Sequence, residues 1–283
     1  MIKVTFTAVA IAGLFSVTTA FADVSDIKAS NNQLVFGIMS TNVDYTETGD
    51  GTLTPSGTLD TEKGSVPGYA LSISTMQDLW LGNDYIETEY DNSSGNTDYT
   101  GALCSTTACG AYGSYVGTSG ATLINYSARY GKGYMVNEEF MLTPYAELGH
   151  HEWDRRVNSG EIYTHNYYGI GVLGQYSPAS KLVLSANALF GSTFGSNIIV
   201  NSGPGFSGFS GALGNSTLYK IGLAADYAFA QNWHGTIGVD YTSFSYGISA
   251  QYPGVVNGIN VILWEPDSKT KYTMVRIGLG YGF

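Results

Sequence analysis

Apolar and polar side chains alternate along the last stretch of the chain. Every second residue counted back from Phe283 to Thr273 is apolar or aromatic except Thr273, and the residues between them are mostly small or polar. A period of two is typical of a β-strand whose two faces meet different surroundings. The apolar set is too hydrophobic to face water, and the other set includes the charge of Arg276, which is unsuited to a dry core. The pattern predicts a strand with one face in lipid and the other in a polar interior.

The same alternation recurs and predicts ten strands, at residues 33–47, 67–76, 80–91, 119–131, 140–157, 162–177, 181–199, 217–230, 234–248 and 271–283. Short turns at 77–79, 132–139, 178–180 and 231–233 alternate with longer polar or glycine-rich loops at 48–66, 92–118, 200–216 and 249–270. Short turns on one side and long loops on the other are typical of a transmembrane β-barrel. Closure is expected, because an open edge would leave unpaired backbone groups in hydrocarbon.

We therefore predict an all-β fold, a closed antiparallel up-and-down transmembrane β-barrel of about ten strands. Eight or twelve strands are the alternatives, because the 92–118 and 249–270 loops each have room for a further hairpin. Within the last loop, the apolar segment 259–264 is expected to be a hairpin, a contact patch or a packed cap.

Residues 1–22 have the pattern of a secretory signal peptide. Lys3 gives a positive start, an apolar run follows to Val17, and Ala20-Phe21-Ala22 matches the small-x-small cleavage pattern. We expect residues 23–283 to be the mature chain and to form a single barrel domain. The first strand is expected within about ten residues of Asp23, which leaves no room for an N-terminal plug.

Composition and charge exclude several classes. Charged residues make up 12% of the 283-residue chain, aromatic residues make up 13%, and Gly occurs 37 times. A disordered chain would carry more charge and fewer aromatics, and a helical membrane protein would need longer apolar runs than occur after residue 22. The formal net charge of −11 and the lack of a basic cluster argue against a nucleic-acid partner.

The two cysteines, Cys104 and Cys109, lie in a segment rich in Gly, Ser and Thr. In an oxidising compartment this spacing predicts a disulfide that closes a short loop. A pair of free thiols and a metal site are the alternatives, but no His lies nearby, and we expect neither a metal nor a cofactor.

The C-terminal strand resembles the terminal strand of bacterial outer-membrane β-barrels, with Phe283 last and Tyr281 and Leu279 at alternating positions inward. The resemblance implies that these residues are the signal read by the outer-membrane insertion machinery. In architecture the mature chain resembles the small OmpA/Opa-like surface barrels. This implies a place in the Gram-negative outer membrane, in contact with its lipid and lipopolysaccharide; a host or small-molecule ligand remains unidentified.

Charged residues at inward positions predict a network in the lumen. Asp226, Asp240 and Arg276 lie on neighbouring predicted strands and are expected to meet, because one cation between two carboxylates limits the cost of burying charge. A gating or conducting role is the alternative to this structural role. The predicted luminal charges are Glu87, Glu89, Arg129, Glu147, Lys220, Asp226, Asp240 and Arg276.

A second charged group is expected above the membrane, at the outer ends of two strands; it consists of Glu87, Glu89, His150, His151, Glu152 and Asp154. Its layout is similar to that of omptin-type surface proteases, which are ten-stranded barrels with acidic residues and an Asp-His pair above the membrane. The match does not extend to their motifs, because no His follows His234. The simpler interpretation is a solvated strand extension beside lipid headgroups; binding of a divalent cation or lipopolysaccharide is a further alternative.

Three functions follow from these patterns. The first is a non-enzymatic outer-membrane barrel that presents surface loops for interaction, adhesion or envelope integrity. The second is a narrow, porin-like channel for small solutes, because ten strands lie between the eight whose interior is filled and the sixteen that enclose a channel. The third is an omptin-like protease or a lipid-modifying surface enzyme.

Overall fold

The computed structural model describes residues 24–283 except 53, 55 and 103–109. The predicted signal peptide and the predicted Cys104–Cys109 disulfide therefore lie outside the described residues and stay predictions. Among the described residues, no helix is long and apolar enough to cross a membrane. The single helix in this part of the chain, α1 (Val24–Ser30), has 7 residues.

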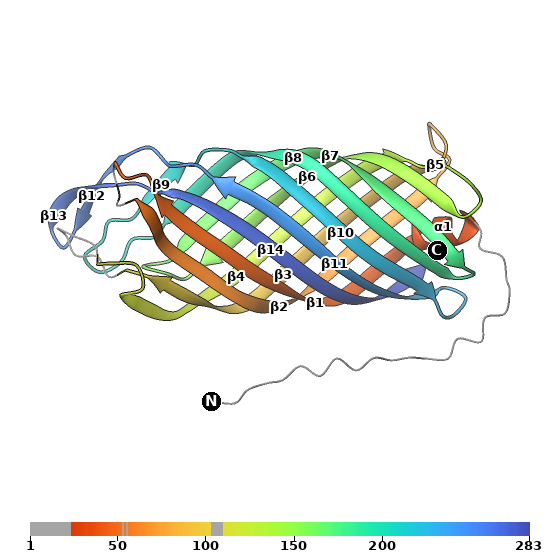
Figure 1. The fold of residues 1–283 in the computed structure, drawn as a ribbon, viewed down its shortest axis with the longest axis horizontal. Coiled ribbons are helices and arrows are strands. Elements are labelled where there is room, and N and C mark those ends of the chain that lie inside the picture. Colours follow the sequence, from red (N-terminus) through yellow and green to blue (C-terminus); the bar gives the residue numbers. More distant parts are fainter. Residues whose placement is uncertain (1–23, 53, 55, 103–109) are drawn as a thin grey trace, which may run out of the picture.

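Ten long antiparallel strands form a closed ring, as predicted (Figure 1). Each pairs with its neighbour in the chain, β1 pairs with β14, and the pairing of β8 with β10 completes the ring. The ring consists of β1 (Gln33–Gly49), β2 (Gly57–Gln77), β3 (Asp84–Gly101), β4 (Tyr115–Lys132), β6 (Phe140–Arg155), β7 (Glu161–Ala179), β8 (Leu182–Val200), β10 (Thr217–Ala228), β11 (Trp233–Tyr246) and β14 (Asp267–Gly282).

The two ends of the barrel differ. Short connections, α1 and the last residue of the chain lie at one end, which we call the turn end (Figure 1). Longer connections lie at the opposite end, which we call the loop end. Short strands occur within the connections at both ends; they are β5 (Tyr134–Met135), β9 (Phe209–Ala212), β12 (Tyr252–Val256) and β13 (Ile259–Leu263).

Two strands are much longer than the alternation predicted. β2 begins at Gly57 instead of residue 67, and β3 ends at Gly101 instead of residue 91. Much of the predicted 48–66 and 92–118 loops is thus barrel wall. Between the loop end and Tyr69 on β2, and between the loop end and Tyr90 on β3, the outward side chains are polar. The alternation of apolar and polar residues therefore stops there, although the backbone pairing of the two strands continues.

The outward face carries an apolar band between two rows of aromatic side chains. Within the band, Ile38, Ile170 and Ile277 are 65%, 72% and 57% exposed on the isolated chain, as expected for side chains that contact lipid. The row toward the loop end consists of Tyr69, Tyr90, Tyr126, Tyr168, Tyr219 and Tyr241. The row toward the turn end consists of Trp80, Tyr130, Tyr176, Tyr227, Trp233 and Tyr281. Such girdles mark the two interfaces of a transmembrane barrel.

The helix α1 packs against the inner wall at the turn end, where no N-terminal plug was expected. It contacts β6, β7 and β8, although it leads into β1 on the other side of the ring. Ile27 is fully buried, and the side-chain amides of Asn31 and Gln175 donate to each other's oxygens at 2.7 and 3.0 Å. A helix of this length spans about 10 Å, so a short segment suffices to cross toward the far wall of a narrow barrel.

The last long connection contains the hairpin of β12 and β13, which pairs apart from the barrel wall. Its turn is Asn257-Gly258, and both residues have positive φ, 50° and 79°, as a tight two-residue hairpin turn requires. The rings of Phe209 and Tyr252 stack at 5.7 Å and tie the hairpin to the connection between β8 and β10. The apolar side chain of Ile259 stays 51% exposed at the loop end.

Candidate functional site

The lumen contains layers of polar side chains, and the first lies at the turn end. His234 Nδ1 lies 2.7 Å from Asp226 Oδ1, and Gln33 donates to the other carboxylate oxygen at 2.9 Å. The prediction that Asp226 meets Asp240 and Arg276 is wrong. The register pairs Asp240 with Gly222, so Asp226 lies four residues closer to the turn end, opposite Thr236.

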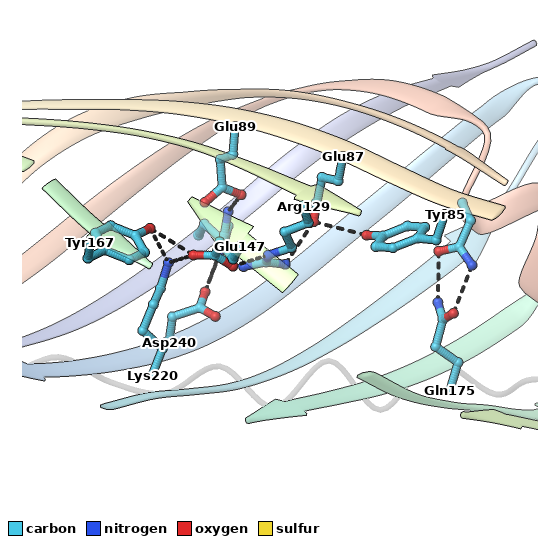
Figure 2. Close-up of polar contacts among 11 residues, drawn as sticks. Tyr85, Glu87, Glu89, Arg129, Glu147, Tyr167, Gln175, Lys220 and Asp240 are labelled. Carbon is cyan, nitrogen blue, oxygen red and sulfur yellow. Dashed lines mark hydrogen bonds and ion pairs between the residues drawn. The ribbon is translucent and has the colours of Figure 1, made fainter. Parts of the chain in front are cut away.

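The next layer, toward the middle of the barrel, is built around Glu147. Figure 2 shows Arg129 and Lys220 reaching this carboxylate from different sides. Lys220 donates to Glu147 at 2.7 Å, and Arg129 donates to it through Nε and to Glu87 through Nη1 at 2.7 Å. Tyr167 also donates to Glu147, at 2.7 Å. Glu147 is 1% exposed, so its charge is compensated by these donors and not by water.

Arg276 holds the second half of this layer. Its Nε lies 3.1 Å from Asp240 Oδ2, and its Nη1 donates to Glu89 three strands away around the ring. The structure thus brings seven of the predicted luminal charges into one layer, which we call the central network; it consists of Glu87, Glu89, Arg129, Glu147, Lys220, Asp240 and Arg276.

A layer of histidine and aromatic rings lies above the central network, toward the loop end. His151 is 3% exposed, and its Nδ1 and Nε2 lie 2.6 and 3.1 Å from Asn125 Oδ1 and the Tyr272 hydroxyl. His165 lies beside it, with ring centroids 5.1 Å apart, and its Nδ1 lies 2.7 Å from the Tyr246 hydroxyl. The two imidazoles are therefore fixed in place by neutral partners.

The predicted cluster above the membrane does not form. On β6 alternate side chains point to opposite faces, so His151 lies in the lumen while His150, Glu152 and Asp154 lie on the outward face. His150 stacks on Tyr126, with ring centroids 4.8 Å apart. The remaining two members, Glu87 and Glu89, belong to the central network, because β3 continues past them to Gly101.

The layer nearest the loop end surrounds Arg155, which directly follows Asp154 at the end of β6. Arg155 is 1% exposed; its Nη2 donates to Asp60 at 2.9 Å, its Nη1 to Glu161 at 3.1 Å, and its Nε to Glu62. The guanidinium carbon lies 4.4 Å from the centroid of the Tyr45 ring. The alternation indicates this position, because Arg155 and the luminal Glu147 are an even number of residues apart on β6 and therefore lie on the same face.

Acidic groups exceed basic ones in this layer, which we call the mouth cluster and which consists of Arg155, Glu47, Asp60, Glu62, Glu161 and Glu265. It lies beyond the Tyr row, outside the membrane-spanning segments. Burial raises the pKa of Glu265 to about 8, and the Tyr163 hydroxyl donates to this carboxyl. Burial also raises the pKa of Glu47 and of Glu161 above the ordinary value of 4.5. These carboxyl groups therefore keep their protons to higher pH than exposed glutamates do.

Comparisons place this architecture among known folds. No protein-family model matches the chain, and no curated protein matches it in sequence. The chain is similar to the crystal structure of the outer membrane protease OmpT from Escherichia coli, with a TM-score of 0.56, 10% identity, and coverage of 90% of this chain and 98% of that one. At this identity the likeness shows the fold alone, that of the outer-membrane β-barrels.

Two further solved structures match over most of their length but with lower TM-scores. They are the translocator domain of the autotransporter NalP from Neisseria meningitidis (TM-score 0.39, 13% identity, 92% of both chains) and the Pseudomonas putida toluene transporter TodX (TM-score 0.33, 10% identity, 93% of this chain and 92% of that one). A protease, a translocator domain and a toluene transporter thus share the barrel architecture, and none of these functions is assigned to this chain.

Proposed function

We propose that the chain is a non-enzymatic, non-conducting barrel of the Gram-negative outer membrane that presents its loop end as an interaction surface. The observation that carries the proposal is the filling of the bore. From α1 to the mouth cluster, successive layers of paired side chains cross the lumen. Several of these contacts join strands three apart in the ring, such as Lys220 on β10 and Glu147 on β6.

The charges support a structural role for the lumen. In a conducting pore, charged side chains line a water-filled path, whereas here Glu147 and Arg155 are each 1% exposed and held by several partners. Buried charges that are paired from two or three sides resist rearrangement, because removal of any one partner leaves an uncompensated charge. The barrel is therefore suited to be a rigid support.

The arrangement of imidazoles supports a non-enzymatic role. A hydrolytic site in which a carboxylate activates an imidazole needs the two groups within hydrogen-bond reach and access for a substrate. Among the described residues, the ion pair between an imidazole and a carboxylate is that of His234 and Asp226. The two residues are 3% and 8% exposed. It lies at the turn end, where α1 packs across the opening.

The loop end has the features of a contact surface. The hairpin of β12 and β13 extends beyond the wall (Figure 1) and exposes Ile259 and Ile262 by 51% and 50%. Exposed apolar side chains grouped in one place favour a protein–protein contact. We include outer-membrane lipid and lipopolysaccharide as partners of the outward face, and the insertion machinery as the partner of Phe283, Tyr281 and Leu279, on the resemblance of the terminal strand.

Conductance tests the first half of the proposal. The purified barrel in planar lipid bilayers is expected to give no steady unitary current, while a general porin reconstituted in the same way conducts. A steady current in the wild type that changes in size with Arg276→Ala would establish a channel and overturn the proposal.

Orientation tests the second half. In a background with Cys104→Ser and Cys109→Ser, Gly258→Cys in the hairpin turn is expected to react with a membrane-impermeant maleimide on intact cells. The matched variant Val136→Cys, exposed at the turn end, is expected to react only after the outer membrane is permeabilised. The reverse pattern would place the hairpin in the periplasm and exclude a surface role for it.

A further inference from the structure

A cavity of about 60 Å³ lies in the lumen between the central network and the histidine layer. Arg276 and Lys220 line its lower side, and His151, His165 and Tyr272 line its upper side. A water molecule needs about 10–15 Å³ measured in this way, so the cavity has room for a small ion and a few water molecules.

Asp91 on β3 lines this cavity and lacks a full set of partners. It is 4% exposed, and its Oδ1 makes no hydrogen bond to any described residue. A buried carboxylate oxygen without a donor is costly, so such an atom normally has a partner that the protein itself does not supply. Its neighbour along the strand on the same face, Glu89, already receives Arg276.

The surrounding charges do not balance. Three carboxylates and three cations line the cavity, and two further carboxylates, Glu87 and Glu147, pair with these cations from outside it, so the whole group has two negative charges in excess. The carboxylates are Glu87, Glu89, Asp91, Glu147 and Asp240, and the cations are Arg129, Lys220 and Arg276. Every cation is already paired with at least one carboxylate other than Asp91.

We propose that this cavity binds one partly hydrated alkali cation, Na⁺ or K⁺, with Asp91 as its carboxylate ligand. Oxygen atoms suit such an ion, and Thr41, Thr242 and the Tyr272 hydroxyl line the same space. In the described residues no group of three His, Cys, Asp or Glu side chains is arranged to hold a metal ion, so the site lacks the several carboxylates that a divalent cage requires. The inference does not depend on the proposed surface role.

Stability in different salts tests the site. Unfolding of the purified barrel is followed in NaCl, KCl and choline chloride at equal ionic strength, because choline is too large for the cavity. A ligand at ten times its Kd raises the folded-to-unfolded ratio about elevenfold, so the wild type is expected to gain about that factor in NaCl or KCl. Asp91→Asn is expected to lose this gain and to be at least as stable as the wild type in choline chloride.

The matched control is Asp98→Asn, which removes an exposed carboxylate from the outward face of the same strand and should keep the full response to Na⁺ or K⁺. Equal stability of the wild type in all three salts would overturn the proposal. An equal gain in Asp91→Asn and the wild type would also overturn it, because the cation would then bind elsewhere.

A direct measurement covers the case in which Asp91→Asn does not fold. Crystals of the wild type soaked in RbCl are expected to show an anomalous peak in the cavity beside Asp91. A cavity without this peak would overturn the proposal.

Discussion

The ammonium group of Lys220 on β10 lies 2.7 Å from the carboxylate of Glu147 on β6, so one ion pair joins strands that are three apart in the ring. Arg129 and Tyr167 complete the coordination of the same carboxylate. The geometry makes Glu147 the residue on which the largest number of strand-to-strand contacts in the middle of the barrel depends.

Glu147→Ala is expected to lower the free energy of unfolding by about 3–5 kcal/mol, because it leaves Lys220 and Arg129 without a shared carboxylate in a buried layer. Urea unfolding in detergent or lipid bilayers measures this loss. The double variant Glu147→Gln/Lys220→Met should lose less than the sum of the two single variants, since it removes both charges. Additive losses would contradict the pair.

Stability is expected to fall as the pH rises from about 4.5 to about 8 because of Glu265. Its pKa is raised to about 8 in the folded barrel by burial, against an ordinary value of 4.5, so the folded state binds the proton more tightly than the unfolded state. The stabilisation is complete below the lower pKa and is lost as pH rises through the higher one.

Glu265→Gln, which keeps the shape and the hydrogen bonding to Tyr163, is expected to flatten this pH dependence. One proton changes the free energy of unfolding by at most about 1.4 kcal/mol per pH unit, so the slope of the wild type minus that of the variant should stay below this limit. Unfolding measured at several pH values between 5 and 9 gives both slopes, and an unchanged slope in the variant would assign the effect to Glu47 or Glu161 instead.

Gly191→Ala is expected to destabilise the wall. A Cβ atom at Gly191 on β8 would lie 2.2 Å from the carbonyl oxygen of Tyr168 and 3.0 Å from the Cα of Gly169 on β7, so the two backbones would have to separate. Overpacking of this kind costs about 1–3 kcal/mol. Gly235→Ala, whose nearest heavy atom would be 3.9 Å away, is the matched control and should change stability little. Equal effects would show that close packing is not the cause.

Ile27→Ala is expected to release α1 from the turn end without opening the bore. The side chain is fully buried, and truncation of a buried Ile costs about 2–5 kcal/mol, which is large for a helix with few other contacts. Hydrogen exchange of residues 24–32 should become faster while that of β7 stays slow. Conductance should remain absent, because the central network and the mouth cluster still cross the lumen; a steady current would show that α1 alone seals the barrel.

The sequence predicted the wall well and the lumen in part. The alternation predicted the ten strands and which residues of each strand face inward, and this was sufficient to place residues such as Glu147 and Arg276 in the lumen. The alternation did not predict the parts of β2 and β3 between Tyr69 or Tyr90 and the loop end, because both faces of these strands are polar there. The structure shows that a paired wall continues there.

Contacts across the lumen could not be predicted, because they depend on the stagger between strands and not on position along one strand. Asp226 illustrates this, since it lies on the predicted face but meets His234 and Gln33 instead of Arg276. Arg155 illustrates the same limit, because its partners Asp60 and Glu62 lie more than ninety residues away in the sequence. A mixed run of charges in sequence resembles a solvated surface until the stagger is known.

The continuation of β2 from Tyr69 to Gly57 raises the loop end far above the lipid. At about 3.3 Å per residue and a tilt near 40°, this stretch lifts the rim roughly 30 Å beyond the aromatic girdle. That height is comparable to the diameter of a small protein domain, so this part of the wall extends well beyond the apolar band. A bulky soluble macromolecule can reach the tip without approaching the bilayer.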